Sequence, residues 1–81
     1  MRLPRDLSGR ELAAALERTF GYKRVHQAGS HIILQVEVPR HHRLAVPDHR
    51  PLRIGTLNAI LRAVSDSQGL SKDDVLRRLS I

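Results

Sequence analysis

Residues 22–47, YKRVHQAGSHIILQVEVPRHHRLAVP, decide the fold of this chain. Through most of this stretch apolar and β-branched side chains alternate with polar ones, and a period of two is typical of β-strands. Turn-forming residues divide the stretch into three pieces. We therefore predict an antiparallel meander of three strands over residues 22–27, 30–38 and 42–46, with a turn at Ala28–Gly29 and a bend at Pro39–Arg40.

A helical pattern precedes these strands. Ser8 and Glu11 have the spacing of a capping box, in which the side chain of each residue satisfies a backbone N–H of the other. Apolar residues then recur every four positions, and Gly21 suits the left-handed backbone conformation that ends a helix. These signals predict a first helix over residues 9–20.

Two more helices are predicted after the strands. Apolar residues from Leu57 to Val64 follow the spacing of an amphipathic helix, for which Thr56 is the predicted N-cap and residues 65–69 are the predicted break. Ser71 then caps a short last helix. The order α-β-β-β-α with an added short helix predicts an α+β sandwich, in which a three-stranded antiparallel sheet carries helices on one face.

The composition predicts one small basic domain. The 81 residues include 14 lysines and arginines against 8 acidic residues, which gives a formal net charge of +6. A chain of this length buries too little surface to enclose a substrate, so any active site must be shallow and open. We expect a single soluble domain over residues 1–81, located in the cytoplasm, because cysteine and long apolar stretches are absent and the charged start Met1–Asp6 is unlike a signal peptide.

The positive charge is concentrated in the middle of the chain. Residues 22–58 hold six basic side chains against two acidic ones, and all five histidines lie there as well. Such a concentration is typical of a surface that attracts phosphates, and it is equally compatible with a solvated basic face. Because Phe20 and Tyr22 are the only large aromatic residues, the chain cannot build a base-stacking platform, so a nucleic acid would be bound through its backbone and shape.

The second predicted strand places a histidine on the open side of the sheet. Its even positions from Ile32 to Val38 are all apolar, whereas its odd positions begin with His31 and continue through Gln35 to Glu37. Successive side chains of a strand point to opposite faces, so the even set faces the helices and the odd set faces away. His31 then stands exposed beside the turn, either as a group that exchanges protons near neutral pH or as a surface histidine without a role.

Other chemical motifs give weaker signals. His41 and His42 are adjacent in a strand and point to opposite faces, so they are poorly placed to share an ion, and we predict no metal site. His49 lies in a rigid loop between Pro47 and Pro51, where it could touch a phosphate. The sequence contains no glycine-rich phosphate loop and no nucleophile elbow.

Three short motifs occur in the same order as in a known family. Gly29-Ser30-His31 opens the second strand, Val46-Pro47-Asp48-His49 closes the third, and Gly55-Thr56-Leu57 begins the second helix. Together they resemble the HicA (YcfA-like) family of mRNA interferase toxins from type II toxin–antitoxin pairs, over nearly the whole chain. The resemblance implies the fold of double-stranded-RNA-binding domains, cleavage of mRNA without the ribosome, and a HicB-type antitoxin as the partner that masks the site.

The resemblance also implies that His31 is the catalytic histidine of the Gly-Ser-His motif. We expect it to exchange a proton with the 2′-OH of the RNA or with the leaving 5′-oxygen, without a cofactor. Two other hypotheses stay open: a non-catalytic RNA-binding module of the same fold, and an interaction domain whose basic face binds an acidic protein. The residues expected to bind RNA or its phosphates are Lys23, Arg24, Gly29, Ser30, His49 and Arg50.

Overall fold

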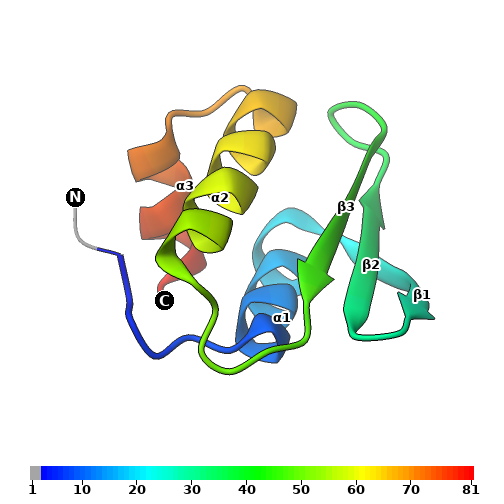
Figure 1. Ribbon diagram of the computed structural model, residues 1–81. Helices are drawn as coiled ribbons and strands as arrows, with labels where there is room; N and C mark the ends of the chain where they lie inside the picture. Colours follow the sequence, from blue (N-terminus) through cyan, green and yellow to red (C-terminus); the bar gives the residue numbers. More distant parts are fainter. Residues whose placement is uncertain (1–2) are drawn as a thin grey trace.

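In residues 3–81, which the computed structural model describes, a three-stranded antiparallel sheet forms one layer and three helices form the other (Figure 1). Met1 and Arg2, the predicted start of the domain, lie outside the described residues. The predicted α+β sandwich with an added short helix is confirmed. The elements follow the chain as α1 (Gly9–Phe20), β1 (Lys23–Ala28), β2 (His31–Val36), β3 (His42–Pro47), α2 (Ile54–Gln68) and α3 (Lys72–Leu79).

The two faces of β2 differ as its alternating sequence predicts. The strand lies in the centre of the sheet, which has the order β1-β2-β3. Its odd positions are exposed or half-buried, beginning with the exposed His31. Its even positions are buried in the core that the sheet forms with the helices, and they are Ile32, Leu34 and Val36.

Two residues at the strand ends depart from the prediction. Val38 is predicted on the buried face, but β2 ends at Val36 and Val38 is 75% exposed, because the chain has already left the strand there. Tyr22 is predicted to begin the first strand, yet it precedes β1 and is buried. A hydrogen bond of 2.7 Å joins its hydroxyl to Nδ1 of His42 on β3, so the ring packs inward instead of following the strand.

The partial burial of His42 leads to a pH-dependent stability. Burial, reinforced by the positive charges of His41 and Arg40, lowers the pKa of His42 below its ordinary value of 6.5. The unfolded chain therefore takes up a proton at a higher pH than the folded chain does. Consequently, the free energy of unfolding falls as the pH drops below about 6.5.

Urea unfolding between about pH 7.5 and about pH 5 measures this loss of stability. We expect His42→Asn to lose part of the wild-type dependence on pH, because the shifted group is gone. The matched variant His26→Asn changes an exposed histidine of β1 and should keep the wild-type dependence. The expectation would be contradicted by identical pH dependence in His42→Asn and the wild type.

Helix α1 begins as predicted. The Ser8 hydroxyl accepts the N–H of Glu11 at 3.1 Å, and the Glu11 carboxylate accepts the N–H of Ser8 at 2.9 Å, so the capping box is confirmed. The bond from the Ser8 backbone lowers the pKa of the Glu11 carboxyl. Leu12 and Leu16 are fully buried and anchor the helix to the core, and Gly21 ends it with a φ of 78°.

Helix α2 begins earlier than predicted. Its N-cap is Arg53, without a hydrogen bond from the capping side chain, so the predicted cap at Thr56 is wrong. The buried residue Leu52 explains the early start, because its N–H donates to the carbonyl of Leu7 at 2.7 Å. This bond fixes the chain directly ahead of the helix and overrides the local preference of threonine for a capping position.

At its other end α2 runs through the predicted break at residues 65–69. The helix continues to Gln68, and only Gly69, with a φ of 68°, ends it. The Arg40 side chain donates to the carbonyls of Asp66 and Ser67 at 2.6 and 3.4 Å. These bonds satisfy carbonyls that lack partners at a helix end, so the polar composition of this segment does not break the helix.

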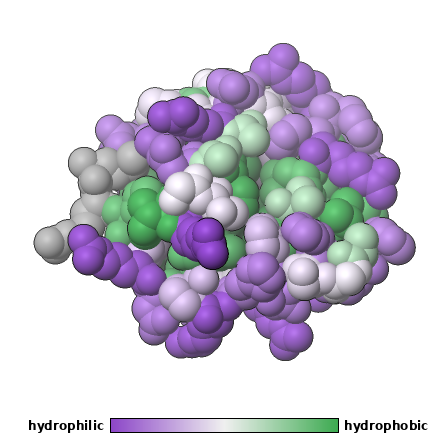
Figure 2. Space-filling model, in the orientation of Figure 1, coloured by the Kyte–Doolittle hydropathy of each residue, from purple (hydrophilic) through white to green (hydrophobic). Residues whose placement is uncertain are grey.

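Helix α3 packs against α1 and α2 and completes the helical layer (Figure 1). It begins as predicted, since the Ser71 hydroxyl accepts the N–H of Asp74 at 3.1 Å. Figure 2 shows hydrophilic side chains between and around the places where apolar ones reach this face of the protein. None of the helices in residues 3–81 has the length and hydropathy that crossing a membrane requires.

Candidate active site

His31 occupies the first position of β2, at the end of the sheet where the chain has just turned back from β1. The turn lies at Gly29–Ser30, one residue later than predicted, and Gly29 has a φ of 58°, which glycine adopts without strain. The residues opposite His31 are Ala28 on β1 and Pro47 on β3. Its side chain is exposed.

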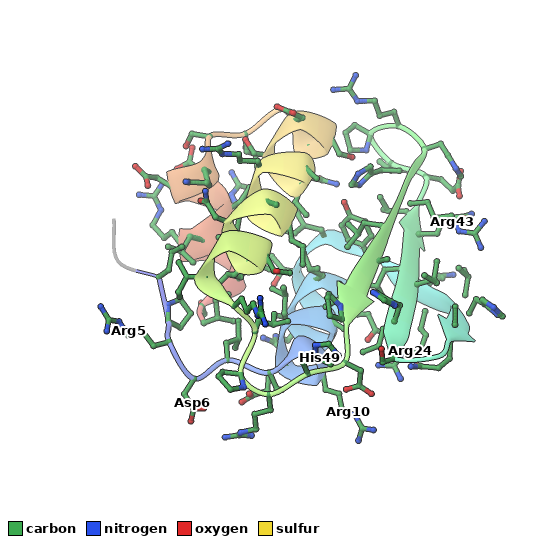
Figure 3. The ribbon with its side chains drawn as sticks, in the orientation of Figure 1. Arg5, Asp6, Arg10, Arg24, Arg43 and His49 are labelled. Carbon is green, nitrogen blue, oxygen red and sulfur yellow. The ribbon has the colours of Figure 1, made fainter. Side chains whose placement is uncertain are left out.

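An open hollow of about 290 Å³ lies at this end of the sheet. Its walls come from β2, from β3 and its connection to α2, and from the first turn of α2. Ligand pockets usually measure about 300–1,000 Å³, so this hollow has the size for a small part of a larger ligand. Figure 3 labels one of its residues, His49, close to the end of β3. The lining residues are His31, Pro47, His49, Leu52, Arg53 and Thr56.

Backbone hydrogen bonds hold the walls of the hollow together. The N–H of Asp48 donates to the carbonyl of Ser30 at 2.6 Å, which joins the connection after β3 to the turn before β2. The N–H of Gly9 donates to the carbonyl of His49 at 2.9 Å, which joins the same connection to the start of α1. The backbones that carry His31 and His49 are therefore fixed relative to each other.

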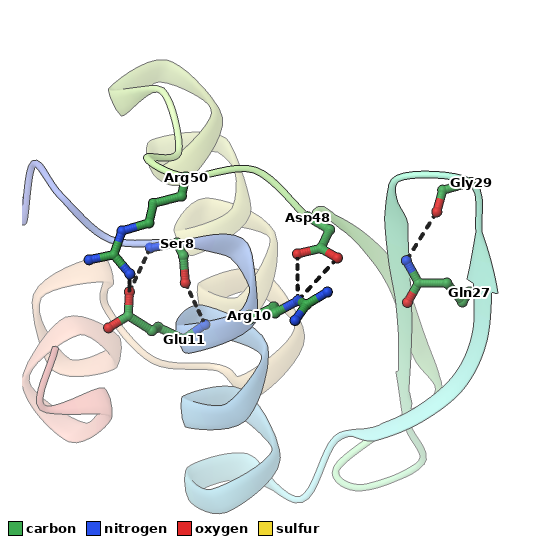
Figure 4. Close-up of polar contacts among 7 residues, drawn as sticks. All are labelled: Ser8, Arg10, Glu11, Gln27, Gly29, Asp48 and Arg50. Carbon is green, nitrogen blue, oxygen red and sulfur yellow. Dashed lines mark hydrogen bonds and ion pairs between the residues drawn. The ribbon is translucent and has the colours of Figure 1, made fainter.

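Two charged residues of this connection are paired with groups on or before α1. The Nε of Arg10 donates to both carboxylate oxygens of Asp48, at 3.0 and 3.2 Å (Figure 4). The guanidinium of Arg50 lies 3.5 Å from the carboxylate of Asp6 and 3.9 Å from that of Glu11. Arg10 thus offsets the negative charge of Asp48 beside the hollow. Arg50, a predicted phosphate-binding residue, faces these carboxylates and does not line the hollow.

Three of the predicted RNA-binding residues lie close to His31. Gly29 and Ser30 form the turn directly before it, and the Gly29 carbonyl is held at 3.1 Å by the side-chain amide of Gln27 (Figure 4). His49 lines the same hollow. The structure thus brings together the Gly-Ser-His motif and the loop histidine, which are far apart in the sequence.

Lys23 and Arg24 lie farther along the sheet. In the register of β1 and β2 they are opposite Gln35 and Leu34, whereas His31 is opposite the last residue of β1. Both residues are exposed. Their place in the register sets them apart from His31, toward the other end of β1.

Arg53 and Thr56 line the hollow although no sequence pattern selects them as site residues. Arg53 is exposed and Thr56 is half-buried. The sequence feature that could have pointed to Arg53 is the short connection between β3 and α2, because it keeps Arg53 near His49. The first backbone N–H groups of a helix also favour anions, and α2 begins directly after Arg53.

A second pair of histidines lies at the opposite end of the sheet. His41 and His42 line a hollow of about 400 Å³ there together with Arg40. One nitrogen of each ring has a partner: Nδ1 of His41 lies 3.0 Å from the Glu37 carboxylate, and Nδ1 of His42 bonds to the Tyr22 hydroxyl. These two histidines lie apart from the hollow beside the Gly-Ser-His turn.

Among residues 3–81 no group of three or more histidine, aspartate, glutamate or cysteine side chains is arranged to hold a metal ion. The family of the protein follows from a comparison with known families. A family model described as the HicA toxin of bacterial toxin–antitoxin systems matches residues 9–65, which is 57 of the 81 residues. The chain belongs to the HicA toxin family. Searches of curated proteins and of solved structures found no match.

The HicA resemblance drawn from the three sequence motifs is confirmed by this match. The matched residues run from the start of α1 to within the last turn of α2. They therefore include the whole sheet, the Gly-Ser-His turn and every residue that lines the hollow. Membership of the HicA family makes this chain one component of a toxin–antitoxin system, in which an antitoxin is the partner.

Proposed function

We propose that this HicA chain is a toxin that cleaves mRNA, with His31 as a catalytic residue. The observation that carries the proposal is the hollow at the end of the sheet, in which the exposed His31 lies together with His49 and Arg53. The hollow is open and small. A site that accepts one phosphodiester linkage of a long RNA chain needs both properties. We further propose that residues 1–81 act as a single domain in the cytoplasm.

The chemistry of RNA makes this residue set sufficient without a metal ion. RNA carries its own nucleophile, the 2′-OH, so cleavage needs a group that takes a proton from it and a group that gives a proton to the leaving 5′-oxygen. It also needs positive charge near the phosphate, where negative charge develops in the transition state. His31 serves one of the two proton transfers, and the guanidinium of Arg53 serves the phosphate.

The remaining predicted residues hold the RNA on either side of the reacting linkage. Gly29 and Ser30 border His31 and would contact the ribose or phosphate next to it. Lys23 and Arg24 are farther along the exposed strand β1 and would contact the backbone of the same RNA. A sheet with few aromatic side chains recognises RNA through its phosphates, 2′-OH groups and shape.

The partner we propose is a HicB-type antitoxin that covers the hollow. The binding sites of RNA and of the antitoxin then overlap, because an antitoxin that excludes RNA from His31 must occupy the same surface. The net charge of +6 favours an antitoxin with an acidic binding surface.

Analysis of RNA cleavage products tests the proposed function. We expect the purified protein to cut single-stranded mRNA into pieces with 2′,3′-cyclic phosphate and 5′-hydroxyl ends, and to do so in the presence of EDTA. Salt-sensitive RNA binding without cleavage would instead support the non-catalytic RNA-binding hypothesis. Cleavage that leaves 3′-hydroxyl ends and stops in EDTA would contradict the mechanism.

A further inference from the structure

We infer that His49 is the second proton-transferring residue of this site, acting with His31 across the hollow. The inference deepens the proposed function and rests on it. From the sequence, His49 is expected to touch a phosphate. Here it transfers a proton as one bond forms and another breaks.

The reaction itself calls for two such groups. The bond from the 2′-oxygen to phosphorus forms while the bond from phosphorus to the 5′-oxygen breaks, and the attacking and leaving oxygens lie on opposite sides of the phosphorus. One proton leaves the 2′-OH and one proton arrives at the 5′-oxygen, so atoms and charge balance without any further reactant. One imidazole on one wall is poorly placed to reach both oxygens, whereas two imidazoles on different walls can each reach one.

The structure supplies two walls with an imidazole on each. His31 comes from the first position of β2, and His49 comes from the connection that leads from β3 to α2. Both are exposed, and both line the hollow of about 290 Å³. The bonds from Asp48 to Ser30 and from Gly9 to His49 fix the backbones of these two walls to each other, so both imidazoles extend from fixed positions.

The charged groups around His49 suit a reaction at a phosphate. Arg53, from the start of α2, lines the hollow beside it. The Asp48 carboxylate is paired with Arg10 of α1, and Arg50 is paired with Asp6 and Glu11. The acidic groups near this loop thus each have a basic partner, which leaves Arg53 to attract the phosphate between the two histidines.

The dependence of the cleavage rate on pH tests the inference. A site with one base and one acid gives a bell-shaped profile of kcat/KM, which we expect for the wild type between about pH 5 and about pH 9. His49→Gln should lower kcat by about 10²- to 10⁴-fold and should remove one limb of the bell. The matched control is His41→Gln, because His41 is also an exposed histidine but lies at the other end of the sheet; it should keep the wild-type rate and profile.

A modified RNA separates proton transfer from phosphate binding. If sulfur replaces the bridging 5′-oxygen at the mapped cleavage position, the leaving group is a thiolate and departs without a proton. The variant that lacks the general acid should then recover most of its rate, while the variant that lacks the general base should not. We expect one of His31→Gln and His49→Gln to be rescued and the other to remain slow.

The outcomes distinguish this inference from the proposed function. The inference is wrong if the wild type cleaves RNA while His49→Gln only raises KM and keeps the bell-shaped pH profile. In that case His49 binds phosphate, and the variant should show the same rise in KM with the sulfur-containing RNA. If the wild type cleaves neither RNA, the proposed function itself is wrong. Circular dichroism and urea unfolding of each variant show that it is folded, which we expect because both side chains are exposed.

Discussion

His31→Ala should lower the rate of RNA cleavage by about 10²- to 10⁴-fold, which is the usual contribution of a residue that transfers a proton in the transition state. The same change should alter the free energy of unfolding by no more than about 0.5 kcal/mol, because the side chain is exposed at a strand end. We thus expect His31→Ala to lose activity while it keeps its stability. Single-turnover cleavage and urea unfolding measure the two quantities on the same sample.

Expression in a bacterial host gives an independent check of His31. We expect the wild-type chain to arrest growth and His31→Ala to relieve the arrest at the same protein level. His26→Ala serves as the control, since His26 is an exposed histidine of β1 that does not line the hollow. A folded His31→Ala protein that cleaves RNA at the wild-type rate would remove His31 from the mechanism.

Gly9→Ala should be strongly destabilising. A Cβ at position 9 would lie 1.8 Å from the carbonyl oxygen of Pro47 and 2.8 Å from its carbonyl carbon. Both are backbone atoms of β3, so no side chain can rotate away, and α1 and β3 must move apart. We expect the free energy of unfolding to fall by about 3 kcal/mol, at the upper end of the usual cost of overpacking.

The substitution should also reduce cleavage, because Gly9 donates the hydrogen bond that holds the carbonyl of His49. Gly55→Ala is the matched control. Gly55 also lies in the first turn of a helix, but a Cβ there would have no heavy atom within 4 Å. It should raise the free energy of unfolding by up to about 1 kcal/mol, because alanine favours a helix more than glycine does. Equal stability changes in the two variants would contradict the packing argument.

Much of the fold is predictable because its signals are local. The alternation in residues 31–36 defines the buried face of β2, and the spacing of Ser8 and Glu11 defines the start of α1. Where a prediction fails, a contact from a distant part of the chain overrides the local signal. Thr56 loses its predicted capping role because Leu52 is held by the backbone of Leu7.

The polar segment at residues 65–69 fails as a predicted break for the same reason. Its composition favours a loop, yet the side chain of Arg40, from the turn between β2 and β3, donates to the carbonyls of its last helical turn. The register of the sheet adds what the sequence leaves open, since it sets Lys23 and Arg24 well along β1 from His31. Distances between residues on different strands depend on the register, which a sequence pattern leaves open.

By itself the sequence determined the sandwich of sheet and helices, the exposed position of His31 and the resemblance to the HicA family, because each depends on side-chain periodicity or on short motifs. Only the tertiary structure decided which residues share a hollow with His31. The close contact of Gly9 with Pro47 and the bonds from Asp48 and Gly9 bring His49 and Arg53 to that hollow. These are contacts between segments far apart in the chain, and the periodicity within a single segment does not predict them.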